Sequence, residues 1–247
     1  MNNSQGDNNI TRFFSSVSRK ISQLGDEISK GHDPSILLLA LIDTLSFYAS
    51  PSESSNRKRF INLIDTYSEW EDKDRVSLPQ LQHLLNRIKI QIPSQKYTQL
   101  TTEVSKRINN WKYGRIYRPS EVDPPAQDLN NYKDNSTEYL INSVRYAELL
   151  WVTRNWLVHT FSKPTGFGAD IGDVRSSPYY IGTIGEKSWT LVIPSQVIYS
   201  IVENCSKNLQ VYFEKNNINP YDQIPFTECW LSARDIKWLE NKIRHAR

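Results

Sequence analysis

An arginine and a histidine on one predicted helix are the side chains of this sequence best suited to chemistry. Arg154 and His159 are five positions apart, and Asn155 directly follows the arginine. A guanidinium group holds a phosphate or a carboxylate through paired hydrogen bonds, and a histidine side chain exchanges protons near neutral pH. These three side chains therefore point to acid–base chemistry beside a bound anion.

Hydrophobic periodicity predicts that these residues share one helix over about residues 137–161. At 100° per residue, one face of this helix is apolar, and Arg154 falls within it. The apolar residues of that face are Val144, Ala147, Leu150, Trp151, Leu157, Val158 and Phe161. Its margin carries three polar side chains, which are Asn155, Glu148 and His159. An arginine on an apolar face needs a partner of opposite charge.

Asp43 is the candidate partner for that arginine. It lies in a second predicted helix, residues 35–49, which is apolar on nearly all sides and begins after the N-terminal signal Asp33-Pro34. A carboxylate in such a helix also needs a partner. Two interpretations remain open: Asp43 and Arg154 form a purely structural ion pair, or Asp43 positions Arg154 at a functional rim.

The motif resembles the HEPN family of helical-bundle ribonucleases. The residues Arg154-Asn155-Trp156-Leu157-Val158-His159 match that family's R-x4-H signature near one end of a core helix, where asparagine often follows the arginine. Together with the early helical segment Ile42-Asp43-Thr44-Leu45-Ser46, the resemblance covers roughly residues 33–161. It implies an endoribonuclease that needs no metal or other cofactor and works as a homodimer.

In such a dimer, two copies of the motif helix would form one cleft that contains both copies of Arg154 and His159. The resemblance implies that His159 takes the proton of an RNA 2′-hydroxyl or delivers one to the leaving 5′-oxygen, and that Arg154 holds the phosphate. Asn155 would orient the imidazole or the phosphate, with Asp43 and Glu148 in supporting positions. The products would be a 2′,3′-cyclic phosphate and a 5′-hydroxyl end.

The same resemblance implies a role in defence, in stress or in a toxin–antitoxin system, with RNA as substrate and an antitoxin or regulatory protein as a further partner. The alternative is a non-catalytic HEPN-like module that binds RNA or a protein.

In toxins of this family that pair with nucleotidyltransferase antitoxins, a tyrosine often follows the histidine by two places. This chain has Phe161 there, so it lacks the hydroxyl that such an antitoxin modifies.

A basic segment at residues 104–120 is a second candidate for contact with RNA. Trp111, Tyr113 and Tyr117 are interleaved with its cations, and it contains no acidic residue. The cations are Lys106, Arg107, Lys112, Arg115 and Arg118. Cationic and aromatic side chains together suit a phosphate backbone with stacked bases. The alternative is a solvated helix face that runs into a loop.

Composition excludes several classes of protein. The chain has four histidines and two cysteines, without the paired spacing of a zinc site or a disulfide framework. Cys205 and Cys229 are therefore expected to be free thiols, and we expect no metal or cofactor. The sequence shows neither a secretion signal nor an apolar run long enough to cross a bilayer, so we expect a soluble, cytoplasmic protein without a membrane partner.

The remaining pattern predicts an all-α, HEPN-like helical bundle with one small β-hairpin and extra C-terminal helices. Residues 1–10 are expected to be disordered, and residues 11–247 to form one domain with its HEPN-like core at about 33–215. Strand-like residues at about 179–193 predict the hairpin. Other helices are expected at about 11–30, 56–69, 78–92, 94–112 and 195–215, with a polar connection at 118–135 and a last helix after Ser232.

Overall fold

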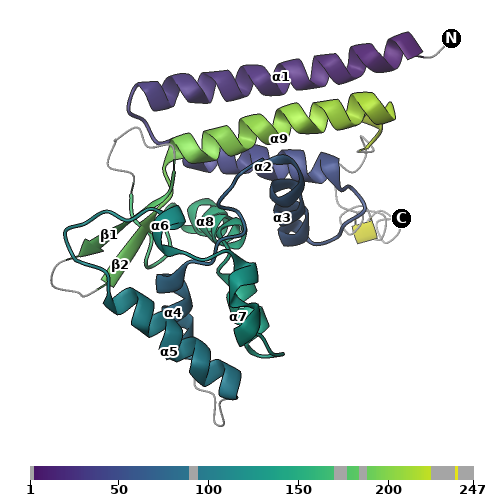
Figure 1. Cartoon of the computed structure of the whole chain (residues 1–247). Coiled ribbons are helices and arrows are strands. Elements are labelled where there is room, and N and C mark those ends of the chain that lie inside the picture. The colour runs from purple at the N-terminus through teal and green to yellow at the C-terminus, as the bar shows by residue number, and fades with distance from the viewer. Residues whose placement is uncertain (1–2, 89–93, 170–176, 184–187, 224–236, 239–247) are drawn as a thin grey trace.

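Three long helices lie side by side at one end of the molecule (Figure 1). The computed structural model describes residues 3–88, 94–169, 177–183, 188–223 and 237–238, and these helices are α1 (Asn3–Ser29), α2 (Ser35–Ala49) and α9 (Ser195–Asn216). α9 lies between the other two, and α3 (Asn56–Tyr67) packs against α2 and α9. α8 (Tyr146–Thr160) contacts α2 and α3 at the centre of the fold.

A second group of helices lies on the far side of α8 from α1 (Figure 1). α4 (Leu78–Arg87) packs against α5 (Gln95–Asn109), and α7 (Thr137–Ser143) contacts both. The 3-10 helix η1 (Ala126–Tyr132) packs on α5 and α7, and a further short one, η2 (Pro220–Asp222), contacts α1. One continuous cluster of buried apolar side chains connects the two groups, so the mostly helical architecture that the sequence predicts is confirmed.

The predicted hairpin is present, and it forms the one β-sheet found among the described residues. β1 (Tyr179–Thr183) pairs antiparallel with β2 (Ser188–Val192), so that Tyr180 lies opposite Leu191. Each strand also pairs at one point with a passing segment: Tyr117 exchanges two backbone hydrogen bonds with Tyr180, and residues 166–168 pair with Leu191. The hairpin therefore joins the segment after α5 to the segment after α8.

The prediction of one helix over residues 137–161 is wrong, because the chain breaks between α7 and α8. At the break, Ser77 N donates to Val144 O at 3.1 Å and Tyr146 N donates to Arg75 O at 3.0 Å. These bonds form an isolated bridge with residues 75–76, and Arg145 takes an extended backbone conformation instead of a helical one. Pairing with a distant segment thus overrides the local helical pattern.

The first helix begins at Asn3, although the sequence predicts disorder up to residue 10 and a helix start at Thr11. Ile10 is fully buried, so the additional N-terminal turns bury an apolar side chain against the bundle.

α4 ends at Arg87, whereas the sequence predicts a helix that continues to about residue 92. The predicted helix after Ser232 lies outside the described residues except for residues 237–238. Among the described helices, none combines the length and apolar character that a bilayer span requires.

The predicted polar connection at 118–135 contains the short helix α6 (Pro119–Val122), the 3-10 helix η1 and a buried carboxylate. Asp123 Oδ2 accepts hydrogen bonds from the hydroxyls of Tyr146 and Tyr180, at 2.8 and 2.6 Å. Its Oδ1 accepts from the backbone N–H of Leu78 at 3.0 Å, near the start of α4. One side chain therefore ties α4, α8 and the hairpin together.

Candidate active site

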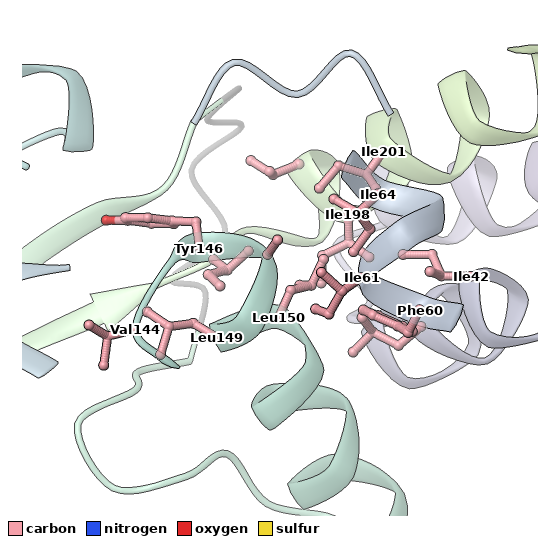
Figure 2. Packing of buried hydrophobic residues seen from close by; sticks show 14 of the residues in the cluster. Ile42, Phe60, Ile61, Ile64, Val144, Tyr146, Leu149, Leu150, Ile198 and Ile201 are labelled. Carbon is pink, nitrogen blue, oxygen red and sulfur yellow. The ribbon is translucent and has the colours of Figure 1, made fainter. Parts of the chain in front are cut away.

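The residues of the motif lie on α8, which is buried only in its first half. Its fully covered side chains are Tyr146, Ala147, Leu149, Leu150 and Thr153. Figure 2 shows Leu150 directed toward Phe60 and Ile61 of α3, whereas Tyr146 points the other way. The second half of the helix, from Arg154 onward, is only partly covered. The helix anchors the site at one end and presents the motif at the other.

Arg154 is held by three neighbours. Its Nη2 forms the predicted ion pair with Asp43 Oδ2 of α2 at 2.5 Å, and its Nη1 donates to Asn155 Oδ1 at 3.0 Å. The guanidinium carbon also lies 5.1 Å from the centre of the Trp151 ring. Only 15% of the Arg154 side chain is exposed, and its Nε has no hydrogen-bond partner in the described chain.

These contacts fix the direction of the guanidinium group. An ionised pair that is partly shielded from water is stronger than an exposed pair, and the aromatic face adds a favourable cation–π contact. Asp43 keeps 27% of its side chain exposed, so the pair lies at the margin of the core and not deep inside it. A pre-oriented arginine at such a margin is suited to meet an anion that arrives from solvent.

His159 is exposed and makes no hydrogen bond or ion pair with any residue that the structure describes. Asn155, one turn before it, is bonded to Arg154 and not to the imidazole. Of the two roles that the sequence leaves open for Asn155, the observed contact fits the orientation of the arginine and its anion. The imidazole is left available for a group from outside this chain.

Glu148 is not brought to the motif. Its Oε2 accepts from Arg57 Nε of α3 at 2.9 Å, so the carboxylate connects the first turn of α8 to the start of α3. Six residues of helix place it about 9 Å from Arg154 along the axis. The structure thus assigns to Glu148 a contact between helices.

Two large apolar side chains at the C-terminal end of α8 are exposed to solvent. Trp156 is 44% exposed and Phe161, directly after the last helical residue, is 84% exposed. The sequence predicts Phe161 on the core-facing side, and that prediction is wrong. The helix ends at Thr160, and Phe161 takes a left-handed conformation with φ of 53°, which directs its ring away from the bundle. Contact with another molecule would bury this apolar ring, and such burial is favourable.

A second polar cluster fixes the chain where it leaves α8. Asp33 Oδ1 accepts from the Ser195 hydroxyl at 2.7 Å and from the Ser35 backbone at 3.0 Å, at the starts of α9 and α2. Lys163 Nζ lies 3.8 Å from Asp33 Oδ2. Burial alone would raise the pKa of Asp33, but hydrogen bonds from Ser35 and Ser195 hold it below its usual value. The exit of α8 is therefore tied to two other helices.

The predicted RNA-binding cations are divided between α5 and the loop after it, away from α8 (Figure 1). Two of them make ion pairs: Arg107 with Glu103 at 2.7 Å, and Arg115 with Glu121 at 3.7 Å. The other three are exposed, and they are Lys106, Lys112 and Arg118. These residues do not contribute to the surroundings of Arg154 and His159 within one chain.

The described residues contain no group of three or more histidine, cysteine, aspartate or glutamate side chains that could hold a metal ion. Burial raises the pKa of the Cys205 thiol to about 12, so this cysteine is neutral at physiological pH. Cys229 and His245 lie outside the described residues. The polar side chains of the motif are those of Arg154, Asn155 and His159.

Comparison with known proteins adds no further constraint on this site. No family model matches the chain, and neither a curated protein nor a solved structure matches it. What the site can do therefore follows from the contacts on α8 and α2.

Proposed function

We propose that this protein is a metal-independent endoribonuclease of HEPN type, with an HEPN-like bundle and an active site that forms between the α8 helices of two copies. One observation carries the proposal. Arg154 is oriented by Asp43 and Asn155, while His159 is exposed and unpaired on the half of α8 that the described chain covers only in part. An anchored cation and an available proton carrier are two groups that can promote cleavage of a phosphodiester when both reach the same phosphate.

Helix geometry supports a site built from two copies. Arg154 and His159 are about 140° apart around α8 and about 7.5 Å apart along it. One helix therefore cannot direct both side chains at the same phosphate. A second α8 that packs on the exposed ring of Phe161, two residues after His159, would bring the partner's His159 toward Arg154, and burial of this ring would stabilise the dimer.

In the proposed reaction, His159 of one copy accepts the proton of the RNA 2′-hydroxyl. The 2′-oxygen forms a bond to phosphorus while the bond from phosphorus to the 5′-oxygen breaks, and the partner's His159 supplies a proton to that oxygen. Arg154 stabilises the charge that develops on the phosphate oxygens, with Asn155 holding the guanidinium in place. The products are a 2′,3′-cyclic phosphate and a 5′-hydroxyl end. One phosphorus–oxygen bond forms for the one that breaks, and one proton is delivered for the one that is removed.

The direct test is incubation of the purified protein with mixed cellular RNA in buffer that contains EDTA. We expect fragments whose 3′ ends carry cyclic phosphate, shown by their resistance to ligation and to tailing until the phosphate is removed. Their 5′ ends should accept a labelled phosphate from a polynucleotide kinase. Intact RNA, or 5′-phosphate ends, would contradict the proposal.

A second candidate function is supported by the burial of Arg154. With 15% of its side chain exposed and Asp43 at 2.5 Å, the arginine also suits a structural ion pair in a non-catalytic HEPN-like module. Such a module would bind RNA or a protein partner without cleaving RNA. It would shift RNA in a gel in the presence of EDTA and leave the RNA intact, which separates it from the enzyme in the same experiment.

Replacement of Phe161 by glycine is expected to act in opposite directions on the monomer and on the dimer. The left-handed φ of 53° costs a non-glycine residue about 1 kcal/mol, so the free energy of unfolding of dilute protein should rise by about that amount. Loss of an exposed ring from the proposed interface should weaken self-association by roughly tenfold or more. Chemical denaturation and sedimentation equilibrium measure the two effects.

Val211→Ala is the matched control, because Val211 is 60% exposed on α9, away from α8. This variant should leave self-association unchanged. If Phe161→Gly associates as tightly as the wild type, the surface around Phe161 is not the dimer interface.

A further inference from the structure

A cluster of aromatic rings lies where the loop after α5 meets the hairpin. Tyr113 stacks on Trp189 of β2, with ring centres 5.1 Å apart and an angle of 7° between the planes. Trp189 in turn meets Trp111 and Tyr117 edge to face, at 5.1 and 5.5 Å. The stack continues into the core through Tyr180, which is fully buried.

The backbone of β1 supports this stack at Gly182. Gly182 lies opposite Trp189 in the hairpin register. A Cβ atom at this position would lie 2.8 Å from Cζ3 of Trp189 and 2.9 Å from Cδ1 of Tyr113. Because the glycine has no side chain, both rings lie directly against the strand. The position of Tyr113 is thus fixed by packing.

Tyr113 is the outer ring of the stack. It is 42% exposed, whereas Trp189 and Tyr117 are each 7% exposed. Trp189 stacks on one side of Tyr113, and Tyr113 still keeps 42% of its surface exposed to solvent. A rigid aromatic ring with one open face is a stacking platform for a planar ligand.

Three cations lie close to Tyr113 in the sequence, and these are Lys112, Arg115 and Arg118. The side chains of Lys112 and Arg118 are exposed and have no hydrogen bond or ion pair among the residues described. Arg115 lies over the Tyr117 ring at 4.8 Å and forms a long ion pair with Glu121 at 3.7 Å, which leaves it 63% exposed. This segment therefore combines an exposed, packed ring with cationic groups that are available to phosphates.

We propose that this surface, formed by Lys112, Tyr113, Arg115, Arg118 and the supporting Trp189, binds single-stranded RNA. A base stacks on the open face of Tyr113, and the cations contact the phosphates on either side. An acidic peptide would use the cations but not the ring face, and a duplex keeps its bases stacked on each other. The choice of RNA over DNA rests on the proposed function. The surface itself, called the platform below, is formed by residues outside α8.

The hairpin connects this platform to the motif helix. Tyr117 pairs with β1, and residues 166–168, which follow α8, pair with β2. At about 4.8 Å per strand, these two segments are about 14 Å apart across the hairpin. The hairpin therefore joins the segment that carries the platform to the segment that follows α8, and the platform would hold RNA outside the site of cleavage.

The test is fluorescence anisotropy with a labelled 12-nucleotide oligouridylate, measured on full-length protein that carries His159→Ala so that the RNA stays intact. Adding Tyr113→Ala to this protein should weaken binding by about 5- to 150-fold. Tyr113→Phe keeps the ring and should bind within about twofold of the parent. Tyr212→Ala is the matched control, because Tyr212 is 41% exposed on α9, away from the hairpin.

Charge variants test the proposal without any change to the packed rings. Replacement of Lys112 and Arg118 by glutamine should reduce the slope of log affinity against log salt by about 0.7 for each phosphate that is no longer neutralised. Equal affinity of the Tyr113→Ala and parent proteins would overturn the platform. Equal binding of a labelled poly-glutamate peptide, or tighter binding of oligothymidylate than of oligouridylate, would overturn the assignment of single-stranded RNA.

RNA cleavage and RNA binding, measured on the same variants, separate failure of the platform from failure of the proposed nuclease function. If wild-type protein cleaves RNA and Tyr113→Ala cleaves with unchanged KM, the platform is excluded while the nuclease stands. If the protein never cleaves RNA but loses binding on Tyr113→Ala, the platform stands and the nuclease is excluded.

Discussion

Replacing His159 by alanine is expected to lower the rate of RNA cleavage by roughly 10²- to 10⁴-fold, the usual contribution of a positioned acid–base group. The imidazole is the proton carrier of the proposed reaction, and Arg154 cannot replace it because a guanidinium group stays protonated. The rate is measured on a labelled single-stranded RNA in EDTA, at protein concentrations that keep the dimer formed. The loss should appear in kcat, since His159 acts on protons and does not hold the substrate.

His159 gives a cleaner test than Arg154. The imidazole is exposed and contacts no described residue through a hydrogen bond, so its removal should leave the free energy of unfolding nearly unchanged. Removal of Arg154 would leave the carboxylate of Asp43 without its partner and would lower stability as well as activity. His83→Ala, at an exposed position on α4, is the matched control and should cleave like the wild type. Full activity of the His159→Ala variant would exclude the proposed mechanism.

Replacing Asp123 by alanine is expected to lower the free energy of unfolding by about 3–5 kcal/mol near pH 5. Three buried donors lose their acceptor, namely the hydroxyls of Tyr146 and Tyr180 and the backbone N–H of Leu78. Each buried donor left unsatisfied costs about 1–3 kcal/mol. The contact of 2.9 Å between the two hydroxyls recovers part of this loss. Urea denaturation followed by circular dichroism measures the change.

The effect of this variant should depend on pH. Burial raises the pKa of Asp123 to about 7, although three hydrogen bonds to the carboxylate oppose the shift. Between about pH 4 and pH 7 the folded protein therefore binds more protons at this residue than the unfolded chain does, and stability falls as pH rises, by up to about 1.4 kcal/mol per unit. The difference between wild type and Asp123→Ala should consequently shrink from pH 4.5 to pH 7.5.

Other carboxylates do not obscure this trend. The pKa of Asp134 is lowered to about 2 by hydrogen bonds led by that of Ser94, so it affects stability below pH 4. Burial raises the pKa of Asp72, which remains in both proteins and cancels in the comparison. Asp128→Ala, at an exposed position on η1, is the control for loss of one surface charge. A difference that grows with pH would show that the buried carboxylate stays ionised.

Elements with strong local signals could be predicted from the sequence. The start of α2 follows the Asp33-Pro34 signal, and Asp33 does accept a hydrogen bond from Ser35 N. α9 and the hairpin also lie where their apolar patterns place them. In each case neighbouring residues determine the element, so no knowledge of the rest of the fold is needed.

Features that depend on distant pairing could not be predicted. The break before α8 arises from backbone pairing with residues 75–76, about 70 positions away in the chain, and no glycine or proline marks it. Asp123 sits in a segment rich in proline and polar residues, and nothing in that segment indicates that tyrosines from two other elements will bury it. Long-range contacts of this kind override local propensity.

At the candidate site, too, some contacts could be predicted from the sequence and others could not. The pairing of Arg154 with Asp43 could be predicted, because Arg154 lies on an apolar helix face and Asp43 lies in a helix that is apolar on nearly all sides. The contact of Glu148 with Arg57 could not, since it depends on how α3 crosses α8. Sequence reasoning also missed the Trp151 ring beside Arg154, although the spacing of three residues places both on one face of the helix.

The small hairpin also influences how the protein behaves when many copies are crowded together. A two-stranded sheet on its own is only marginally stable, and its open edges can capture strands from other molecules. Here each edge is occupied by a neighbouring stretch of the same chain, through Tyr117 on one side and residues 166–168 on the other. Each pairing covers one position of its edge, which shortens the stretch of backbone that a strand from another molecule could meet.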